Sequence, residues 1–530
     1  MKPYFVVFLV LSALHTWPLV TAPAHLSRNN NADTILNEWT VAWVAHQIVR
    51  DPVHLFNANI FYPDKRTLAM SENLIAPALM GAPLLWLGAS PVLTYNLLLL
   101  LGFALTGWTT FIVVSSWTGD RMAGLVSGSL LAFNAHSLTR LPHLQAIHAE
   151  FIPLALLALD DLVRERRVRH AVLLALWFVL NGLTSIYLMV FLIVCLTAAL
   201  VVRTEIWASR AVLKTVARRL ALAAAIAAAA LLPVLLPYYR IHTEQGLVRP
   251  LDEVAYYSAG WRDYLLTGGR LHWSLWAHRI GDATALFPGV TALALGIVTL
   301  ATGIAFRDRR ARICLAIGVA GVLLSFGPAM PGYTTLYETF PPMQALRASA
   351  RFGWLALLAL ALLAGFAVAH IRARWIARPS LATAAGSVLL VLVNVEALRA
   401  PIGYTPFDRI PDTYARLAAE PPGAVIEFPI YSPLQFARNA GYMLNSTAHW
   451  KPLVNGYSGF VAPQYGERAG RFASFPRPDA LAALRTAGVR YAVVHASGIS
   501  NSAQVFKEAM HTPGLSLLWE EPGIRVFRIE

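Results

Sequence analysis

The sequence contains few charged residues. Only 14% of its 530 residues are Asp, Glu, Lys or Arg, and just 29 residues are acidic. Soluble domains carry about a quarter charged residues, so this composition excludes an ordinary soluble protein. Hydrophobic residues make up 57% and the mean hydropathy is +0.53. Many apolar runs approach the ~20 residues with which a helix crosses a bilayer, and we therefore predict a polytopic membrane protein.

Cysteine is also scarce. The sequence has two, Cys195 and Cys314, and both lie inside apolar runs, which excludes a disulfide framework and a thiolate metal site. The formal charge of +14 comes from short basic clusters between apolar runs. A nucleic-acid-binding protein needs its basic residues on one solvated face, so we expect no nucleic-acid partner. No low-complexity segment and no repeat of solenoid period is visible.

Eleven apolar runs predict membrane-spanning helices. They lie at residues 1–20, 91–116, 122–135, 147–163, 170–184, 186–202, 219–237, 285–305, 313–327, 352–370 and 381–398. A cleaved signal peptide is the alternative for the first run, but no clean small-x-small site follows it, and we expect an uncleaved anchor. Segment 74–88 is short and carries Pro77, Pro83 and two glycines. It predicts a re-entrant or interfacial helix.

The basic clusters predict the orientation. If the N-terminus is cytoplasmic, nearly every dense Lys/Arg cluster falls on a cytoplasmic loop, as the positive-inside rule requires. These loops are 117–121, 164–169, 203–218, 306–312 and 371–380. Counting 74–88 as a full span would move the next four loops to the wrong side. We therefore predict a mainly α membrane helical bundle over residues 1–398, in the cytoplasmic (inner) membrane.

The remaining polar regions are predicted to lie outside the cytoplasm: 21–90, 136–146, 238–284, 328–351 and the tail 399–530. In the tail, "DTYARLAAEPPGAVIEFPI" and "DALAALRTAGVRYAVVH" each predict a helix, a turn and a strand. "LSLLWEEPGIRVFRIE" predicts two strands about a turn. We expect a small extracytoplasmic α/β domain there. Because the cytoplasmic loops hold little beyond basic anchors, an active site would face outward.

Two acids follow the first apolar run in "NNNADTILNEW", namely Asp33 and Glu38. A carboxylate at the rim of the hydrocarbon layer is partly desolvated, which raises its basicity. It then suits abstraction of a proton from an acceptor hydroxyl. The five-residue spacing puts the acids on different faces of a helix, so a shared metal site needs the loop to fold back. A solvated loop acid is the alternative.

Polar residues also gather before two later spans. "LTRLPHLQAIHAEFIPLALLAL" places His143 and Gln145 at the outer end of a span, where they line a cavity or merely cap the interface. "HLQAIH" lacks the His pair of a zinc metalloprotease helix. In "FPPMQALRASARF", Arg347 and Arg351 are predicted to share one helical face. They could grip a phosphate at headgroup depth, or else anchor the helix end.

Two outer loops are rich in aromatic residues. "STAHWKPLVNGYSGFVAPQY", residues 446–465, brings together His449, Trp450, Asn455 and Tyr457 between glycine turns. This loop is predicted either to close over the membrane site as a lid or to dock the tail. Segment 257–284 is predicted to form a sugar-stacking loop or part of an aromatic belt.

Taken together, the outward carboxylate, the interfacial helix, the many spans and the outer C-terminal domain resemble the GT-C class of integral-membrane glycosyltransferases. The phrases "FYPDKRTLAMSENL", "RLPHLQAIHAEFIPLALLAL", "FPPMQALRASARF" and "HWKPLVNGYSGF" are similar to those of a group of bacterial GT-C-like membrane proteins. The resemblance implies transfer of a hexosyl or pentosyl group from a polyprenyl-phosphate donor on the outer face of the membrane. The acceptor would be a glycan, a lipid or a protein, and the anomeric carbon would invert.

The resemblance also implies roles for particular residues. Asp33 takes the position of the general base, and Glu38 is the second candidate catalytic acid. Glu38 lies off the usual close acid pair, so a divalent cation stays open and the sequence itself requires no cofactor. Arg347 and Arg351 match a phrase similar to "RAPARF", with Ser349 where Pro is usual. The candidate substrate-binding residues are Glu72, His143, Gln145, Arg347, Arg351, His449 and Trp450.

A different class of function is the alternative. A non-catalytic membrane protein, or a transporter of lipid-linked glycans, would use a similar cavity. Transporters of this kind often contain broken helices in paired repeats. The one interrupted apolar segment, 74–88, has no clear counterpart in the second half of the sequence, which favours the enzyme.

Overall fold

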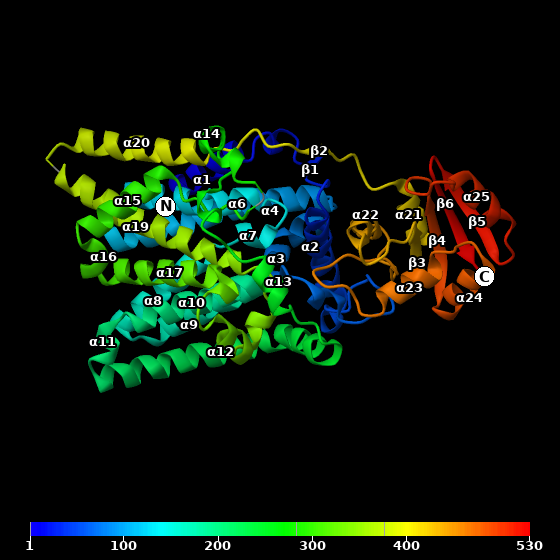
Figure 1. Cartoon of the computed structure of the whole chain (residues 1–530), viewed down its shortest axis with the longest axis horizontal. Coiled ribbons are helices and arrows are strands. Elements are labelled where there is room, and N and C mark those ends of the chain that lie inside the picture. Colours follow the sequence, from blue (N-terminus) through cyan, green and yellow to red (C-terminus); the bar gives the residue numbers. More distant parts are fainter. Residues whose placement is uncertain (1, 282, 376) are drawn as a thin grey trace. The chain divides into compact units, whose positions relative to one another are not determined.

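The computed structural model describes residues 2–281, 283–375 and 377–530, which are mainly helical. They pack as two compact units (Figure 1). The first unit comprises Met1–Pro23, Asn96–Leu235 and Val248–Gly403, and the second comprises Ala24–Tyr95, Leu236–Leu247 and Tyr404–Glu530. Segments far apart in sequence therefore share one unit. The predicted domain division at 398/399 stays a prediction.

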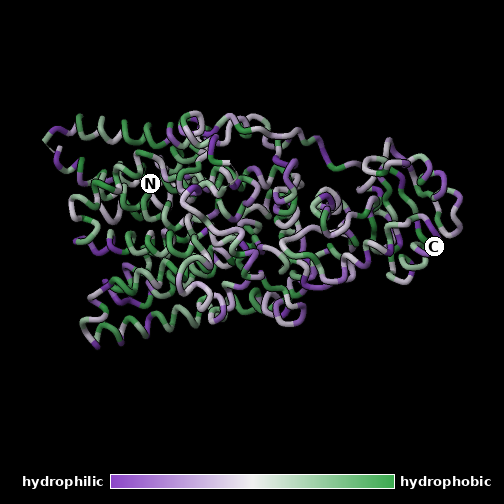
Figure 2. Tube along the Cα trace, viewed as in Figure 1, coloured by the Kyte–Doolittle hydropathy of each residue, from purple (hydrophilic) through white to green (hydrophobic). Residues whose placement is uncertain are grey.

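The first unit is a helical bundle, and each predicted span overlaps a helix that lies wholly or mostly in this unit. These are α1 (Lys2–His15), α4 (Pro91–Thr118), α5 (Arg121–Ala132), α8 (Phe151–Glu165), α9 (Val168–Gly182), α10 (Ile186–Val201), α12 (Arg210–Gln245), α15 (Val290–Ala301), α17 (Arg309–Ser325), α19 (Gly353–Arg374) and α20 (Pro379–Ala397). Figure 2 shows hydrophobic residues along these helices and hydrophilic residues at their turns.

Four helical segments of the described residues are long and apolar enough to cross a membrane: Pro91–Thr118, Arg210–Gln245, Ser349–Arg374 and Pro379–Ala397. Other apolar helices of this unit, such as α9 and α10, are shorter. The number of spans therefore stays a prediction. Helix α12 continues to Gln245, so the prediction that residue 238 begins an outer loop was wrong; "YYRIHTEQ" has no glycine or proline to stop the helix.

Shorter helices join the long ones. On the segments predicted to be cytoplasmic are α11 (Thr204–Trp207) and α16 (Ile304–Arg307). The segments predicted to be outside contain α6 (Ala135–Thr139), α7 (Leu144–Ile147), α13 (Leu251–Tyr256), α14 (Arg270–Leu275) and α18 (Tyr333–Thr339), with 3-10 turns such as η7 (Pro341–Ala345) and η8 (Ser349–Phe352).

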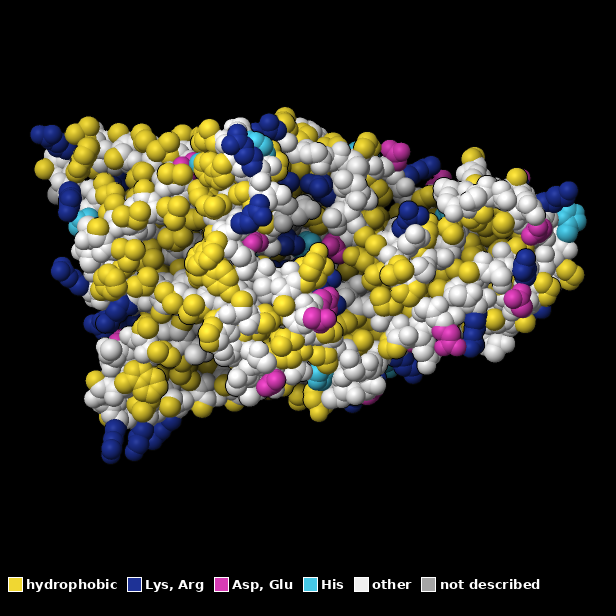
Figure 3. All heavy atoms as spheres, in the orientation of Figure 1, with side chains coloured by type: hydrophobic (Ala, Val, Ile, Leu, Met, Phe, Trp, Pro, Cys, Tyr) yellow, Lys and Arg dark blue, Asp and Glu magenta, His cyan; other side chains and the backbone are white. Residues whose placement is uncertain are grey.

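Ion pairs tie together the loops that carry the basic clusters. Asp160, near the end of α8, pairs with Arg203 and with Arg310 (2.8 Å to the latter). Asp120, before α5, pairs with Arg372 at 2.7 Å. Lys and Arg side chains gather at this end of the bundle in Figure 3. The predicted cytoplasmic loops thus share one end of the bundle, while the side of the membrane that they face stays a prediction.

Two of the few acids begin helices. Asp120 Oδ1 accepts the N–H groups of Met122 and Ala123 at 2.8 and 3.0 Å. Asp308 caps α17 in the same way. A capping carboxylate satisfies N–H groups that the helix leaves open. Several of the few acidic residues in this chain therefore cap helices or form ion pairs.

The second unit contains a four-stranded sheet in the order β3-β4-β6-β5. Strand β3 (Ala424–Phe428) pairs in parallel with β4 (Val489–His495), whereas β6 (Ile524–Ile529) is antiparallel to both β4 and β5 (Leu515–Glu521). The tail also contains α21 (Asp412–Ala419), α22 (Ala440–Ser446), α23 (Tyr465–Phe472), α24 (Pro478–Thr486) and α25 (Ser502–His511). The helices and strands predicted for the tail are present, and Gly488 (φ +74°) makes the turn from α24 to β4.

The first polar region belongs to this second unit. It forms α2 (Ala32–Arg50) and α3 (Ile75–Trp86), and β1 (Leu26–Ser27) pairs with β2 (Thr405–Pro406). The N–H of Tyr62 donates to the carbonyl of Leu453 at 2.9 Å. Helix α3 lies within the segment predicted to be interfacial.

Candidate functional site

Asp33 lies in the first turn of α2. Asn31 caps this helix, since its side-chain oxygen accepts the N–H of Asp33 at 2.9 Å. The expectation that Asp33 and Glu38 lie in a loop was wrong, because the "NNN" run supplies a cap and "ADTILNEW" continues as helix. The phenol of Tyr457 donates to Asp33 Oδ1 at 2.7 Å. Asp33 is half-buried. Its carboxylate is thus oriented by Tyr457 and still partly accessible to solvent.

Glu38 lies in a different environment on the same helix. Its side chain is fully buried, and its carboxyl group accepts hydrogen bonds from the Ser27 hydroxyl at 2.9 Å and from the Asn29 amide. Burial raises the pKa of Glu38 to about 8, so it is mostly protonated near neutral pH. Because Asp33 and Glu38 lie five residues apart on α2, they leave it on different faces, and they contact different partners.

A hard cation prefers several charged oxygens, whereas Asp33 and Glu38 bond to different partners. The part of the chain that the structure describes contains no group of three or more His, Cys, Asp or Glu side chains placed to hold an ion.

The loop 446–465 reaches α2 at two separate places. Tyr457 contacts Asp33, whereas the ring of Trp450 stacks on His46 with 4.2 Å between centroids. His46 lies thirteen residues beyond Asp33, which is ~20 Å along a helix. Trp450 has a φ of +55°, a strained conformation for a bulky residue. Its neighbour His449 is buried, which lowers the pKa of that imidazole to about 3.

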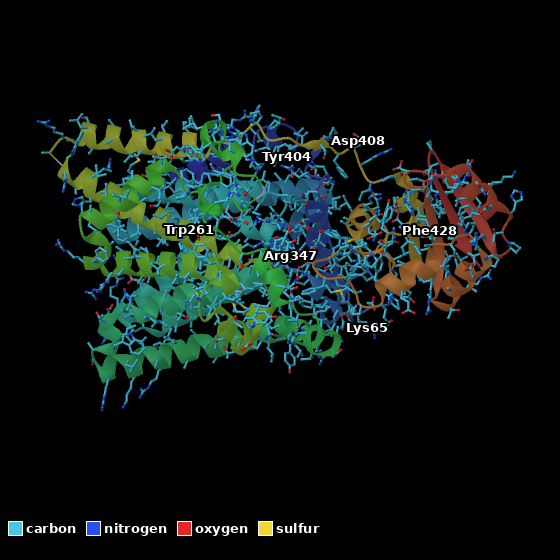
Figure 4. The ribbon with its side chains drawn as sticks, viewed as in Figure 1. Lys65, Trp261, Arg347, Tyr404, Asp408 and Phe428 are labelled. Atoms are coloured by element: carbon cyan, nitrogen blue, oxygen red, sulfur yellow. The ribbon has the colours of Figure 1, made fainter. Side chains whose placement is uncertain are left out.

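Trp450 also lines a cavity of the second unit, with a volume of about 530 Å³. His46, Trp86, Asp408 and Arg409 line it as well; Figure 4 labels Asp408 on the segment between β2 and α21. Glu72 lies elsewhere in this unit, half-buried between the 3-10 turn η3 (Thr67–Met70) and α3.

In the first unit, the chain between Arg347 and Arg351 is not an α-helix. The prediction that the two arginines share a helical face was therefore wrong. Ala348 is extended (φ −111°, ψ 92°) and η8 follows it. The N–H of Ala348 donates to the Tyr187 hydroxyl at 3.0 Å, a tertiary bond that replaces a helical one. Arg351 lies over the ring of Tyr187, 4.6 Å from its centroid, and Arg347, labelled in Figure 4, lies over another tyrosine.

Arg351 lines a narrow cleft with two other predicted residues, His143 and Gln145, and with Arg140 and Tyr187. The cleft has a volume of about 30 Å³, comparable to the share of one liquid water. Burial lowers the pKa of His143 well below its usual range, and the charge of Arg351 acts in the same direction. His143 is therefore neutral near pH 7.

Several residues lining this cleft have a buried polar atom without a hydrogen-bond partner within the described residues, among them Gln145 Oε1 and Arg351 Nε. Buried polar groups are nearly always paired, so these atoms indicate a ligand or ordered water. The structure thus brings three of the predicted residues together, from two segments that are predicted to lie outside the cytoplasm. Sequence reasoning missed Tyr187, because it lies within an apolar run and gives no signal of its own.

The sequence matches no protein-family model and no curated protein. Solved structures do match. Mycobacterial arabinofuranosyltransferase AftD superposes with a TM-score of 0.62 at 17% identity, over 99% of this chain and 41% of AftD. ArnT from Cupriavidus metallidurans, bound to undecaprenyl phosphate, gives 0.51 at 13% identity, over 99% of this chain and 97% of ArnT. The apo oligosaccharyltransferase of Archaeoglobus fulgidus gives 0.50 at 11%, over 93% and 69%.

This chain therefore spans less than half the length of AftD. At these identities the likeness concerns the fold. All three neighbours are GT-C glycosyltransferases, so the resemblance found in the sequence is confirmed at the level of architecture. The chain is a multi-pass membrane protein with the fold of the GT-C glycosyltransferases.

Proposed function

We propose that this protein is a membrane glycosyltransferase. It transfers a sugar from a polyprenyl-phosphate donor to an acceptor on the outer face of the cytoplasmic membrane, with inversion at the anomeric carbon. The GT-C fold supports this activity, and ArnT, one of the structural neighbours, binds undecaprenyl phosphate. The observation that carries the proposal is the half-buried carboxylate of Asp33, oriented by the Tyr457 hydroxyl.

Asp33 is the general base in this proposal. Its carboxylate takes the proton of an acceptor hydroxyl while the oxygen attacks the anomeric carbon of the donor. The bond between that carbon and the phosphate oxygen breaks on the opposite face, and the lipid phosphate leaves with the bonding electrons. A carboxylate near the N-terminus of α2 is also stabilised by the helix dipole. Glu38, protonated and buried, supports α2 and transfers no proton.

Arg351, which lines the cleft, binds the departing phosphate, and Arg347 adds a second positive charge. The leaving phosphate keeps its charge, so it needs cations and no acid, and a guanidinium group offers paired donors that match phosphate oxygens. Neutral His143 and Gln145 add hydrogen bonds in the same cleft. Glu72, His449 and Trp450 contact the acceptor. Asp33 belongs to the second unit, whereas the two arginines belong to the first.

The test compares Asp33→Asn with the wild type in proteoliposomes supplied with polyprenyl-phosphate sugars. We expect a loss of at least about a hundredfold in donor consumption, the usual range for removal of a general base. Asp51→Asn is the matched control, because Asp51 lies at the other end of α2 and its carboxylate bonds to the nearby His54. Both variants are checked for folding by gel filtration and thermal unfolding.

Full activity of a folded Asp33→Asn variant would refute the base assignment. If the wild type consumes no donor but still binds it, the non-catalytic alternative replaces the enzyme.

A further inference from the structure

The cavity of about 530 Å³ lies within the second unit, and the proposed reaction uses only Trp450 of the residues that line it. Its volume is typical of small-molecule sites, which span about 300–1,000 Å³. The indole of Trp86 lines it together with that of Trp450. Five alanines line it as well: Ala24, Ala42, Ala45, Ala89 and Ala448. Small side chains beside two large aromatic surfaces leave a space that a flat ligand can enter.

Both indoles are held in a fixed orientation. The Nε1–H of Trp86 donates to the carbonyl of Ala45 at 3.0 Å, which ties the end of α3 to α2. The ring of Trp450 stacks on His46 and also contacts Trp43, with 5.8 Å between the centroids of the two indoles. Rings that are already ordered lose little conformational entropy when a ligand packs on them.

The backbone of Trp450 indicates that its position serves a ligand. A φ of +55° is strained for so bulky a residue, and such residues cluster at sites where a side chain must be held for binding. Trp86 is 55% exposed although its N–H already has a partner. The face of its ring is therefore available for contact.

The charged side chains of the cavity balance each other. Asp408, labelled in Figure 4, and Arg409 are adjacent and exposed, and they contribute one charge of each sign. Burial and the charge of Arg50 lower the pKa of His46 to about 4, so its imidazole is neutral near pH 7. These groups offer hydrogen-bond donors and acceptors together, for which a fatty acyl chain has no partner. They suit a neutral ligand with several hydroxyl groups and an apolar face, which is the chemistry of a sugar ring.

The place of the cavity along α2 bears on the length of its ligand. His46 lines the cavity, whereas Asp33 lies ~20 Å away along the same helix. The loop 446–465 contacts α2 at both places, through Trp450 and through Tyr457. A sugar ring built from bonds of ~1.5 Å spans roughly 5 Å, so a chain of roughly four rings covers this distance and a single sugar does not.

We propose that the Trp86–Trp450 cavity binds a sugar ring of the acceptor, and that the acceptor is therefore an oligosaccharide. The ring packs on the indoles, and its hydroxyl groups bond to Asp408 and Arg409. The sugar at the other end of the chain then presents its hydroxyl to Asp33. This last step rests on the proposed function, whereas binding of a sugar in the cavity does not.

The test is an array of immobilised glycans that carries single sugars, disaccharides and longer oligosaccharides of cell envelopes. Fluorescently labelled full-length protein in detergent micelles is titrated onto it as wild type, Trp86→Ala, Trp86→Phe and Trp519→Ala. Trp519 is the matched control, because this half-buried tryptophan of β5 bonds to Thr413 and is not among the described residues that line the cavity. Gel filtration and thermal unfolding verify that each variant is folded.

We expect the wild type to bind longer oligosaccharides at least about tenfold more tightly than single sugars. Trp86→Ala should lose about tenfold in affinity for the longer glycans, because one aromatic side chain at the centre of a site often dominates binding. Trp86→Phe should retain part of the affinity, since a smaller ring remains. Trp519→Ala should bind as the wild type does.

The proposal is overturned if the wild type binds no glycan of the array, or if a folded Trp86→Ala variant binds them as the wild type does. An equal loss in Trp519→Ala also overturns it, because the effect would then reflect the stability of the whole unit. Binding of a short-chain phosphatidylcholine that depends on Trp86, with no glycan bound, would assign the cavity to lipid instead.

The array contains no donor and requires no sugar transfer. Its failure therefore leaves the proposed function standing. A wild type that binds the glycans but consumes no polyprenyl-phosphate sugar would refute the proposed function alone.

Discussion

The hydroxyl of Tyr457 donates a hydrogen bond of 2.7 Å to the carboxylate of Asp33, across 424 positions of sequence. Tyr457 is itself packed against Phe436, with 5.0 Å between ring centroids. A hydrogen bond to a charged group is worth about 1.5–3 kcal/mol. In the proposed reaction, this bond fixes the direction in which the carboxylate meets the acceptor.

Tyr457→Phe tests that role. We expect kcat to fall by on the order of tenfold, because the carboxylate loses its orientation, while the KM for the donor stays within about twofold. Steady-state kinetics with a polyprenyl-phosphate sugar provide the measurement. Tyr465→Phe is the control, since the Tyr465 hydroxyl donates to the Tyr431 carbonyl in the same unit. A loss in KM alone would mean that Tyr457 binds substrate instead.

Glu38 makes stability depend on pH. Burial raises its pKa from 4.5 to about 8, so between these values the folded protein holds a proton that the unfolded chain releases. The stability associated with this group is highest below about pH 4.5 and falls as the pH rises toward about 8. Glu38→Gln should remove this dependence and exceed the wild type by on the order of 3 kcal/mol near pH 7. Thermal unfolding across pH measures it, and parallel curves for the two proteins would contradict it.

Arg351 should matter more than Arg347 for binding a lipid phosphate. Arg351 lines the cleft that His143 and Gln145 share, whereas Arg347 lies over the ring of Tyr257 outside it. We expect Arg351→Ala to weaken binding of farnesyl phosphate by about tenfold or more, and Arg351→Lys to restore part of it. Equal losses in the two alanine variants would show that the cleft is not the phosphate site.

Alanine variants of the neighbours Asp160 and Asp161 test whether a buried ion pair stabilises the end of the bundle that carries the basic loops. Asp160 is buried and pairs with Arg203 and Arg310, whereas its neighbour Asp161 pairs with Arg164, which is largely exposed. Breaking a buried pair leaves uncompensated charge and costs about 3–5 kcal/mol, while an exposed pair contributes about 0–1 kcal/mol. Asp160→Ala should therefore lower the melting temperature clearly and Asp161→Ala hardly. Similar shifts would mean that Asp160 is not a structural anchor.

The orientation in the membrane can be tested with cysteines. Cys195 and Cys314 are both buried, so the native background should react little with a maleimide. We expect a membrane-impermeant maleimide to label Ser274→Cys from outside, but to leave Arg167→Cys unlabelled until the membrane is permeabilised. Labelling of Arg167→Cys alone would invert the predicted topology.

Much of the fold follows from local patterns. The apolar runs predicted the positions of the long helices. A segment that crosses the hydrocarbon layer must be apolar along its length and must pair its own backbone groups, which a helix does. The tail was predictable because alternating strands, proline-glycine turns and a glycine such as Gly488 act over a few residues. The carboxylate of Asp33 stood out for a similar reason, as an acid where acids are few.

The rest depends on long-range contacts. Helical spacing suggested one face for Arg347 and Arg351, but Ala348 and Ala350 direct their N–H groups to Tyr187 and Tyr257, so the helix does not form there. The sequence of a segment carries no information about such distant partners. The role of Tyr187 could not be predicted for the same reason, since only its neighbours in space distinguish it from other residues of an apolar run.

The second unit is built from segments that the ribosome makes at widely separated times. Helix α2 is made early, yet Tyr457 and the strands of residues 404–530 come last. At about 5–20 residues per second of synthesis, Asp33 waits for its partner for roughly tens of seconds while the intervening helices are made. A late stop codon that spares every predicted span would still leave this carboxylate without Tyr457.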